Sequence, residues 1–165
     1  MRTLKEQMVA WIKDYFAKNG DENTKALIGI SGGKDSTVVA AACVAALGKD
    51  RVVGVMMPNG VQTDINDSKR VCEFLGIKNY EVNIKGAYDA LTQEITAKTA
   101  GEATPQFKTN TPSRLRMATL YGVAAIIGNC RISNNGNKSE RLMGYFTIWG
   151  DGAGDFAPLA NLYVS

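Results

Sequence analysis

The sequence predicts an α/β fold, in which a parallel, twisted sheet is flanked by helices. Three short apolar runs, at residues 26–30, 51–57 and 80–84, have the length of buried strands. Helical stretches separate these runs, and the alternation repeats over roughly 25 residues, which is typical of β–α–β units. The 165 residues are close to the length of one domain of about 150 residues, so we expect a single domain over residues 1–165.

The chain begins with an amphipathic helix over residues 4–18, and Gly20 follows as its end. The first strand, at 26–30, leads directly into a turn, and a second helix begins at about Asp35. Its residues 37–47 are almost all apolar and small, which predicts a helix that is buried on most sides. The apolar face of the first helix comprises Leu4, Met8, Trp11, Ile12, Tyr15 and Phe16.

The next units repeat this order of strand, turn and helix. The second strand ends at the turn sequence PNG of residues 58–60. A helix over 65–75 follows, and Gly76 is positioned as its C-cap. The third strand then precedes a helix near 86–98.

The pattern changes in residues 99–113, which contain four Thr and two of the four Pro. This segment has neither a helical nor a strand period, which predicts a long loop of functional or mobile character. Thr111 and Pro112 then predict the start of a helix that runs to about Ile127, with Thr as the cap and Pro in the first turn. The remaining predicted elements are a strand at 130–133 and a helix near 138–145.

The composition restricts the chemistry before any motif is considered. The chain has no histidine, which excludes catalytic triads, Cys–His dyads and His-based metal sites within it. Lys and Arg number 19 and Asp and Glu 16, a net charge of +3, so we expect neither a nucleic-acid nor a membrane partner. Any catalysis must use carboxylates, hydroxyls, cations, backbone amides and a bound metal.

The cysteines and the N-terminal segment favour a cytoplasmic location. Cys43, Cys72 and Cys130 are odd in number and far apart, which predicts reduced thiols rather than a disulfide framework. Charged residues interrupt the apolar ones at the start of the chain, unlike in a signal peptide. No stretch of about 20 apolar residues is present to span a bilayer.

The segment SGGKDS at residues 31–36 carries the strongest chemical signal. Its glycines permit a tight turn between strand and helix, where backbone N–H groups and the helix dipole bind anions. The hydroxyls of Ser31 and Ser36 can donate to phosphate oxygens, and Lys34 adds a positive charge. Asp35 would be repelled by a bare phosphate, so it indicates a bridging Mg²⁺. The structural alternative is a glycine-rich turn that merely opens a buried helix.

Two common nucleotide-binding loops do not fit this segment. The pattern GxxxxGK[ST] fails because Asp35 follows Lys34, and GxGxxG is absent. SGGKDS instead resembles the pyrophosphate loop of the ATP pyrophosphatases, which cut ATP between the α and β phosphates and adenylate a substrate. This resemblance implies a Rossmann-like sheet of the adenine nucleotide alpha hydrolase type.

Three further segments make the resemblance more specific. MPNGVQTD at 57–64, NTPSRLRMATLYG at 110–122 and NGNKSERLMGYFTIWGDGAGDFAPLANLY at 135–163 are similar to the NAD synthetase family. The resemblance implies a ligase that amidates deamido-NAD to NAD with ATP, Mg²⁺ and ammonia, through an acyl-adenylate, and releases AMP and pyrophosphate. It also implies a homodimer. A glutaminase would need a further domain, so free ammonia or ammonia from a partner is expected.

The resemblance also implies roles for single residues. Lys34 and Asp35 match the catalytic positions, and Asp35 and Glu140 match the pair that holds Mg²⁺. Arg114 and Asp155 match contacts to the dinucleotide, and Asp151 lies in the loop of Asp155. The implied ATP contacts are Gly29, Ile30, Ser31, Gly32, Gly33, Lys34, Asp35, Ser36 and Asn135.

Several of these residues also have structural interpretations. Glu140 alone is equally consistent with an exposed acid at the start of a helix. Arg114 and Arg116 point to different helix faces, so one can bind a phosphate or carboxylate while the other is a surface charge. Asp151 and Asp155 are also typical of Asx turns.

The sequence departs from the family pattern at three positions and in length. Ile148 and Val164 stand where many members have lysines that contact the dinucleotide and ATP, and Asn135 replaces a threonine that touches ATP. Members usually continue further, so the chain is expected to be short at its C-terminus. Two alternative functions follow: another pyrophosphatase-loop enzyme, of the tRNA-modifying type, or a non-catalytic ATP-binding domain.

Overall fold

Four parallel strands form the centre of the computed structural model, which describes residues 2–163. The strands are β1 (Lys25–Gly29), β2 (Val52–Met56), β3 (Lys78–Glu81) and β4 (Cys130–Ile132). Their order in the sheet is β3-β2-β1-β4, and Ala26 of β1 pairs with Val52 on one side and Arg131 on the other. The predicted α/β fold with a parallel sheet is therefore confirmed.

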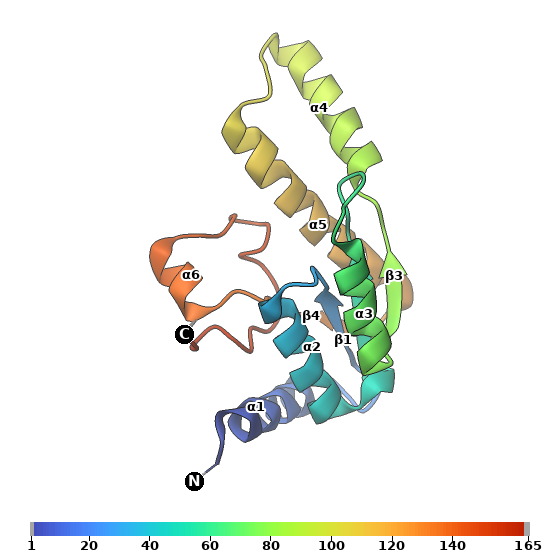
Figure 1. The fold of residues 1–165 in the computed structure, drawn as a ribbon, viewed down its shortest axis with the longest axis vertical. Coiled ribbons are helices and arrows are strands. Elements are labelled where there is room, and N and C mark those ends of the chain that lie inside the picture. The colour runs from blue at the N-terminus through green and yellow to red at the C-terminus, as the bar shows by residue number, and fades with distance from the viewer. Residues whose placement is uncertain (1, 164–165) are drawn as a thin grey trace.

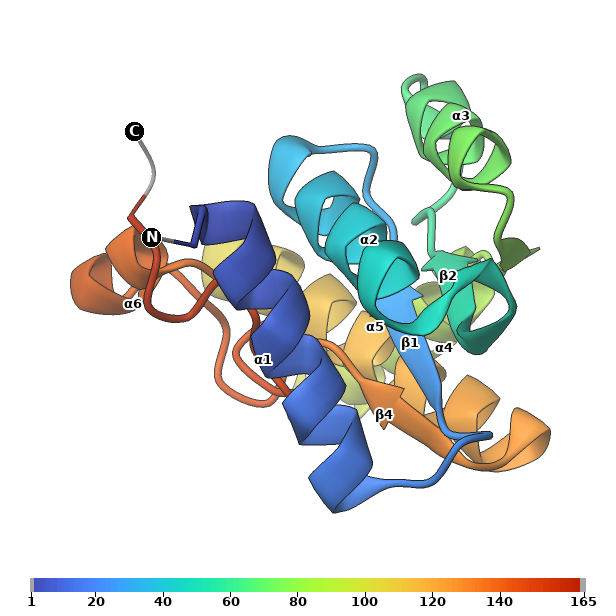
Figure 2. The same cartoon turned by 90° about the horizontal axis from the view of Figure 1, so that it is seen from below.

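Helices cover both faces of this sheet, as Figure 1 and Figure 2 show. They are α1 (Leu4–Asn19), α2 (Lys34–Leu47), the 3-10 turn η1 (Lys49–Arg51), α3 (Ile65–Leu75), α4 (Lys85–Thr99), α5 (Pro105–Ile127) and α6 (Lys138–Met143). Ala26 and Ile28 of β1 belong to the core shared with α1, α2 and α3, whereas Leu27 packs in the core that contains α5. Alternate residues of a strand face opposite sides, so β1 separates the two layers. Within the described residues, none of the helices has the length and hydrophobicity needed to cross a membrane.

The strand order creates a switch point beside β1. The chain leaves β1 through α2 to reach β2 and then β3, and it returns through α4 and α5 to β4 on the other side of β1. The connections that follow β1 and β4 therefore diverge at the carboxyl ends of these strands. In open α/β sheets, such a point is the usual place for a ligand.

Three helices agree with their predicted ranges to within one residue at each end. These are the helices predicted at 4–18, 65–75 and 86–98. Gly76 ends α3 as expected, with a left-handed φ of 61° and an N–H that donates to the carbonyls of Cys72 and Glu73. The helix predicted near 138–145 ends earlier, at Met143, because Gly144 adopts a left-handed φ of 67°.

The prediction of a loop over 99–113 and a helix start at Thr111 is wrong. Helix α5 already begins at Pro105, because Thr104 is its N-cap and accepts a hydrogen bond from the Phe107 N–H. Pro112 lies inside the helix, where it removes one donor from the hydrogen-bond ladder. The chain contains two Thr-Pro pairs, and the first pair is the true helix start.

The third strand is also displaced from its predicted position at 80–84. The strand β3 spans Lys78–Glu81, but its parallel pairing continues beyond this range. The N–H of Val82 donates to Met56 O (2.8 Å), and the N–H of Ile84 donates to Pro58 O (2.9 Å). The residues predicted as a strand therefore remain paired to the chain after β2, although the regular element ends sooner and Ile84 already has helical angles as the N-cap of α4.

Candidate functional site

The carboxyl ends of β1 and β4 open onto a cavity of about 990 Å³. Its walls come from the loops after β1, β2 and β4, from α5, and from the segment after α6. Segments far apart in the sequence thus meet at the switch point of the sheet, where a ligand is expected. The polar side chains in its walls include Ser31, Asp35, Asp64, Arg116, Glu140 and Asp155.

Residues 31–36, the SGGKDS loop, fold back on themselves through two serines. Ser31 Oγ accepts a hydrogen bond from the Gly33 N–H (3.2 Å) and lies 3.1 Å from Ser36 Oγ, which donates to Gly33 O (3.1 Å). Helix α2 begins directly after Gly33, and no side chain of the described residues caps it. The N–H groups of its first turn can therefore bind an anion, and the helix dipole favours one there.

Gly32 lets this loop approach α3 closely. Its φ of +78° favours glycine, and a Cβ on Gly32 would lie 3.0 Å from both Ser68 N and Asp67 Cβ. Ser68 is fully buried, so its backbone has little room to move away. Both the backbone conformation and the packing thus require glycine at this position.

Asp35 and Glu140 line the same cavity, and Asn137 connects them. The Asn137 amide donates from Nδ2 to Asp35 Oδ2 (3.3 Å) and accepts at Oδ1 from the Glu140 N–H (3.0 Å). Glu140 Oε2 in turn accepts from the Asn137 N–H (3.0 Å), which completes a capping box at the start of α6. The structure therefore brings to one cavity the two acids that the family resemblance assigned to Mg²⁺.

Sequence reasoning missed Asn137, although a signal for it was present. An Asn followed three residues later by Glu is typical of a helix N-terminus with a capping box. The Asn137 side chain is buried, with 3% of the residue exposed. Because both sides of its amide are used, this residue fixes the position of Asp35 relative to α6.

The carboxylates of Asp35 and Glu140 suit a hard cation that takes only a few of its ligands from the protein. Two carboxylates are available, and the described residues contain no group of three or more His, Cys, Asp or Glu side chains that could form a complete metal cage. Mg²⁺ is usually held by one or two carboxylates, with the other positions filled by water and by phosphate oxygens of the substrate. Asp35 and Glu140 fit this pattern.

Asp151 and Arg116 also line the cavity. Asp151 Oδ1 accepts hydrogen bonds from Ser113 Oγ (2.7 Å) and the Thr147 N–H (2.8 Å), which tie the turn after α6 to α5. Arg116 donates from Nε to Met57 O (3.0 Å). Burial lowers the pKa of Arg116, and the nearby charge of Asp151 opposes this effect.

Asp155 lies where β4 ends and is bonded on several sides. Its Oδ2 accepts from the Ile132 N–H (2.7 Å), and the Tyr121 hydroxyl lies 3.5 Å from its Oδ1. Burial raises the pKa of Tyr121, and the negative charge of Asp155 raises it further. The Tyr15 hydroxyl donates to the backbone carbonyl of Asp155 (2.9 Å), so this segment is also anchored to α1.

Two other predicted residues have different surroundings. Asn135 donates from Nδ2 to Gly29 O (3.0 Å) and accepts from Ser133 Oγ (2.8 Å), so its amide joins the ends of β1 and β4. Arg114 is exposed, does not line the cavity, and donates from Nε to Ile148 O (3.1 Å). Of the two arginines in α5, it is Arg116 that lines the cavity. Val164 lies outside the described residues.

A family model described as NAD synthase matches residues 4–165 of this chain. The chain is 38% identical over 164 residues to the NH(3)-dependent NAD(+) synthetase of Pyrococcus furiosus, an alignment that covers 99% of this chain and 61% of that protein. It is 39% identical to the corresponding protein of Pyrococcus horikoshii, with 96% of this chain and 59% of the relative covered. The chain thus spans about three fifths of the length of these curated relatives.

Solved structures share the fold. The NH3-dependent NAD synthetase from Campylobacter jejuni superposes with a TM-score of 0.85 at 31% identity, covering 97% of this chain and 67% of that one. A glutamine-dependent NAD+ synthetase from Acinetobacter baumannii gives a TM-score of 0.88 at 30% identity, covering 97% of this chain and 30% of that one. The observed sheet and its helices therefore agree with the fold of these proteins.

Proposed function

Because this chain belongs to the NAD synthase family, we propose that it carries out ATP-dependent amidation of deamido-NAD (nicotinic acid adenine dinucleotide) to NAD with ammonia. The observation that carries the proposal is the cavity that joins the SGGKDS loop, Glu140 and Asp155. One end of this cavity can bind phosphates, and the other offers fixed polar groups to a second substrate. The enzyme class that follows is a ligase that forms a C–N bond.

The proposed reaction has two steps. A carboxylate oxygen of deamido-NAD attacks the α-phosphorus of ATP, the bond from this phosphorus to the bridging oxygen breaks, and pyrophosphate leaves. Ammonia then attacks the acyl carbon, the carbon–oxygen bond to AMP breaks, and the nitrogen loses a proton. Neither step requires an imidazole, which agrees with a chain that has no histidine, because positioning and charge neutralisation can supply the catalysis.

We assign the phosphates of ATP to the N-terminus of α2. The N–H groups of the first turn of α2, together with the Lys34 ammonium, would stabilise the negative charge that develops on the departing pyrophosphate. The ATP contacts under this assignment are residues 29–36 and Asn135. Asn135 also holds the end of β1 in place, because its amide donates to the carbonyl of Gly29.

Asp35 and Glu140 are the proposed Mg²⁺ ligands. Asn137 holds the Asp35 carboxylate through its side-chain amide and the Glu140 carboxylate through its backbone N–H, so both side chains are oriented before a ligand arrives. When bound, Mg²⁺ supplies Lewis-acid neutralisation of phosphate charge. Lys34 and the N–H groups at the start of α2 would add to that neutralisation.

We assign deamido-NAD to the wall that contains Asp151 and Asp155, with Arg114 at its exposed edge. Asp151 is held by Ser113 and Asp155 by the backbone of Ile132, so both carboxylates are fixed in orientation. Fixed acceptors of this kind suit hydrogen bonds from ribose hydroxyls or an amide. The exposed Arg114 guanidinium suits a phosphate or carboxylate that extends beyond the cavity.

The test is an assay for stoichiometric products. Incubation with MgATP, ammonium and deamido-NAD should form AMP and NAD in equal amounts, as measured by chromatography. Replacement of deamido-NAD by NAD, which lacks the carboxylate nucleophile, is the matched control and should stop AMP formation. Absence of AMP from the complete mixture would contradict the proposal.

The same assay distinguishes the two alternatives. Binding of MgATP without any AMP formation would favour the non-catalytic ATP-binding domain. AMP formation that requires tRNA would favour an RNA-modifying enzyme, which is less well supported because the matching family is NAD synthase.

We also propose a homodimer in the cytoplasm. Helix α4 projects from the sheet beside the first half of α5 (Figure 1), and within the described chain it has no buried residue. Its Leu91 and Ile95 are exposed apolar side chains that a second copy could cover. Light scattering should give twice the chain mass of 17.8 kDa, and a monomer mass would contradict the dimer. The three free thiols suit a reducing compartment.

A further inference from the structure

The loop between β2 and α3, residues 57–64, forms one wall of the cavity. Met57, Gln62 and Asp64 of this loop line the cavity. The loop does not leave the sheet at once, because the Ile84 N–H still donates to Pro58 O (2.9 Å). The position of Gln62 and Asp64 therefore depends on α3, which begins directly after Asp64, and on what holds the chain between Pro58 and Gln62.

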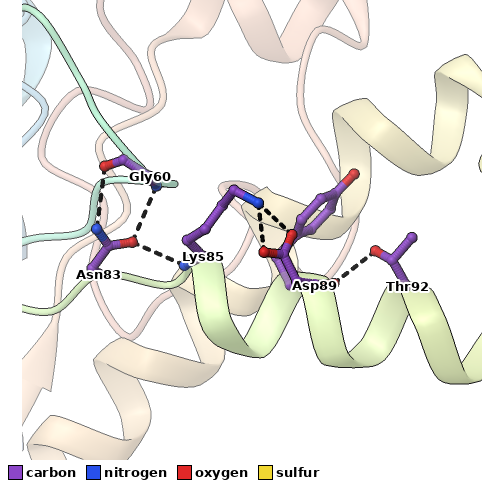
Figure 3. A network of polar contacts seen from close by, with 6 residues as sticks. Gly60, Asn83, Lys85, Asp89 and Thr92 are labelled. Carbon is purple, nitrogen blue, oxygen red and sulfur yellow. Dashed lines mark hydrogen bonds and ion pairs between the residues drawn. The ribbon is translucent and has the colours of Figure 1, made fainter.

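Asn83 makes that contact. Its Oδ1 accepts from the Gly60 N–H (3.1 Å), and its Nδ2 donates to Gly60 O (3.2 Å). The same Oδ1 also accepts from the Lys85 N–H (3.0 Å), at the start of α4. Figure 3 shows the amide between Gly60 and the first turn of that helix. One side chain thus satisfies both backbone groups of Gly60, as another strand residue would.

Gly60 is the point at which the loop changes direction. Its φ of +89° is left-handed, and a Cβ there would lie 3.4 Å from Lys85 Cδ. Lys85 is itself held by Asp89, one helical turn later, through an ion pair with an Nζ–Oδ2 distance of 2.5 Å. The turn of the loop is therefore fixed against the start of α4.

The end of the loop next to β2 is held independently of Asn83. Arg116 donates from Nε to Met57 O (3.0 Å), and this contact does not involve Asn83. Loss of Asn83 should therefore release only the part of the loop after Pro58. That part carries Gln62 and Asp64 into the cavity wall.

We propose that Asn83 is a positioning residue for the nucleotide site, acting through Gly60 on Gln62 and Asp64. Asn83 itself does not line the cavity, so it does not touch the ligand. The identity of that ligand as ATP rests on the proposed function, whereas the hold of Asn83 on the loop does not. The two parts can be tested separately.

The first test needs no ligand. In Asn83→Ala, hydrogen exchange of the Gly60 amide should accelerate about tenfold or more, because a bonded donor becomes free. Asn83→Asp keeps the two acceptor bonds and loses the donor bond to Gly60 O, so it should give a smaller acceleration. Asn79→Ala is the matched control, because the Asn79 amide donates to Ile77 O (3.3 Å) rather than to the loop. Unchanged exchange at Gly60 in Asn83→Ala would overturn the proposal.

The second test measures nucleotide binding. Calorimetry should show MgATP binding that is weaker by about tenfold in Asn83→Ala and by about threefold in Asn83→Asp, but unchanged in Asn79→Ala. In turnover, the KM for ATP should rise while kcat changes by less than about twofold, because the SGGKDS loop is not disturbed. A fall in kcat at constant KM, or an equal effect of Asn79→Ala, would overturn the positioning role. If the unaltered protein binds no MgATP, the proposed function fails, and the exchange comparison alone supports or overturns the hold of Asn83 on Gly60.

Discussion

Asn137 is the residue whose substitution separates helix capping from the organisation of the acids. Asn137→Ala removes the N-cap of α6 and the bond to Asp35, so the free energy of unfolding should fall by about 1 kcal/mol. Asn137→Ser keeps an oxygen for the cap but is too short to reach Asp35. Both variants should need about tenfold more Mg²⁺ for half-maximal ATP binding, as measured by a Mg²⁺ titration, whereas only the alanine variant should lose stability. An unchanged Mg²⁺ requirement in both variants would show that Asn137 only caps the helix.

Gly32 combines a positive φ with a tight contact, and Gly144 allows the two to be separated. Gly144 has a left-handed φ of +67°, but a Cβ there would meet nothing within 4 Å. Gly144→Ala should therefore cost only the conformational term of about 1 kcal/mol. Gly32→Ala should cost about 1–3 kcal/mol and should also weaken MgATP binding, because the SGGKDS loop must shift away from Ser68. Equal losses in urea unfolding for the two variants would contradict the contribution of the contact.

At the scale of single residues, the sequence predicts the chemistry better than the geometry. It identifies Asp35, because an acid beside an anion-binding loop indicates a cation. Glu140 was assigned only through the family resemblance, and the fold brings both acids to one cavity. The sequence does not identify Asn137 or Asn83 as readily, because their roles depend on contacts across the fold. The Asn137 amide reaches the Asp35 carboxylate, and the Asn83 amide reaches the backbone of Gly60. The choice between Arg114 and Arg116 is open in the sequence for the same reason. Only the rotation of α5 decides which of them faces the cavity.

At the scale of elements, α5 is the instructive case. Two Thr-Pro pairs each have the form of a helix start, and local sequence does not rank them. The structure uses Thr104, and it accommodates Pro112 inside the helix with its side chain buried. The strands were predicted more reliably because their apolar runs reflect burial on both faces. β3, at the edge of the sheet, is mostly exposed, and its limits were the least accurate.

Thr104→Ala tests the observed start of α5. The Thr104 side chain accepts from the Phe107 N–H (3.1 Å), so its loss should lower the free energy of unfolding by about 1 kcal/mol. The matched control is Thr109→Ala, since the Thr109 hydroxyl donates to the Pro105 carbonyl of its own helix and caps nothing. That variant should change the stability by less than about 0.5 kcal/mol. Denaturant unfolding measures both, and a larger loss in Thr109→Ala than in Thr104→Ala would contradict the assigned cap.

At the scale of the whole molecule, the fold follows from the alternation of strands and helices, but the cavity does not. Its walls combine loops from β1, β2 and β4 with the middle of α5, and these meet only because β1 lies between β2 and β4. The strand order is a non-local property, since it depends on the side of β1 to which the chain returns. The family resemblance, rather than the periodicity, was therefore what allowed the residues of the site to be grouped.

The two-layer core also predicts how the protein responds to alkaline pH. Cys43 of α2 is fully buried between α1 and the sheet, and burial raises the pKa of its thiol from 9.0 to about 12. In the unfolded chain the thiol ionises first, so the free energy of unfolding should fall as the pH rises from about 9 to about 12, by roughly 1.4 kcal/mol per pH unit. Below about pH 9 this thiol adds no pH dependence, because it is protonated in both states.

Two variants isolate the contribution of Cys43. Urea unfolding at about pH 8 and about pH 10.5 should show a clearly smaller loss of stability in Cys43→Ala than in the unaltered protein. Cys130→Ala is the matched control. Burial raises the pKa of Cys130 as well, but Lys25 and Arg131 act to lower it, so removal of this thiol should flatten the profile less. Burial also raises the pKa of Tyr15 and Tyr121, so part of the alkaline loss should persist in both variants. Profiles of equal steepness for Cys43→Ala and the unaltered protein would mean that the Cys43 thiol ionises as readily in the folded state as in the unfolded one, which contradicts its burial in the α1–α2 layer.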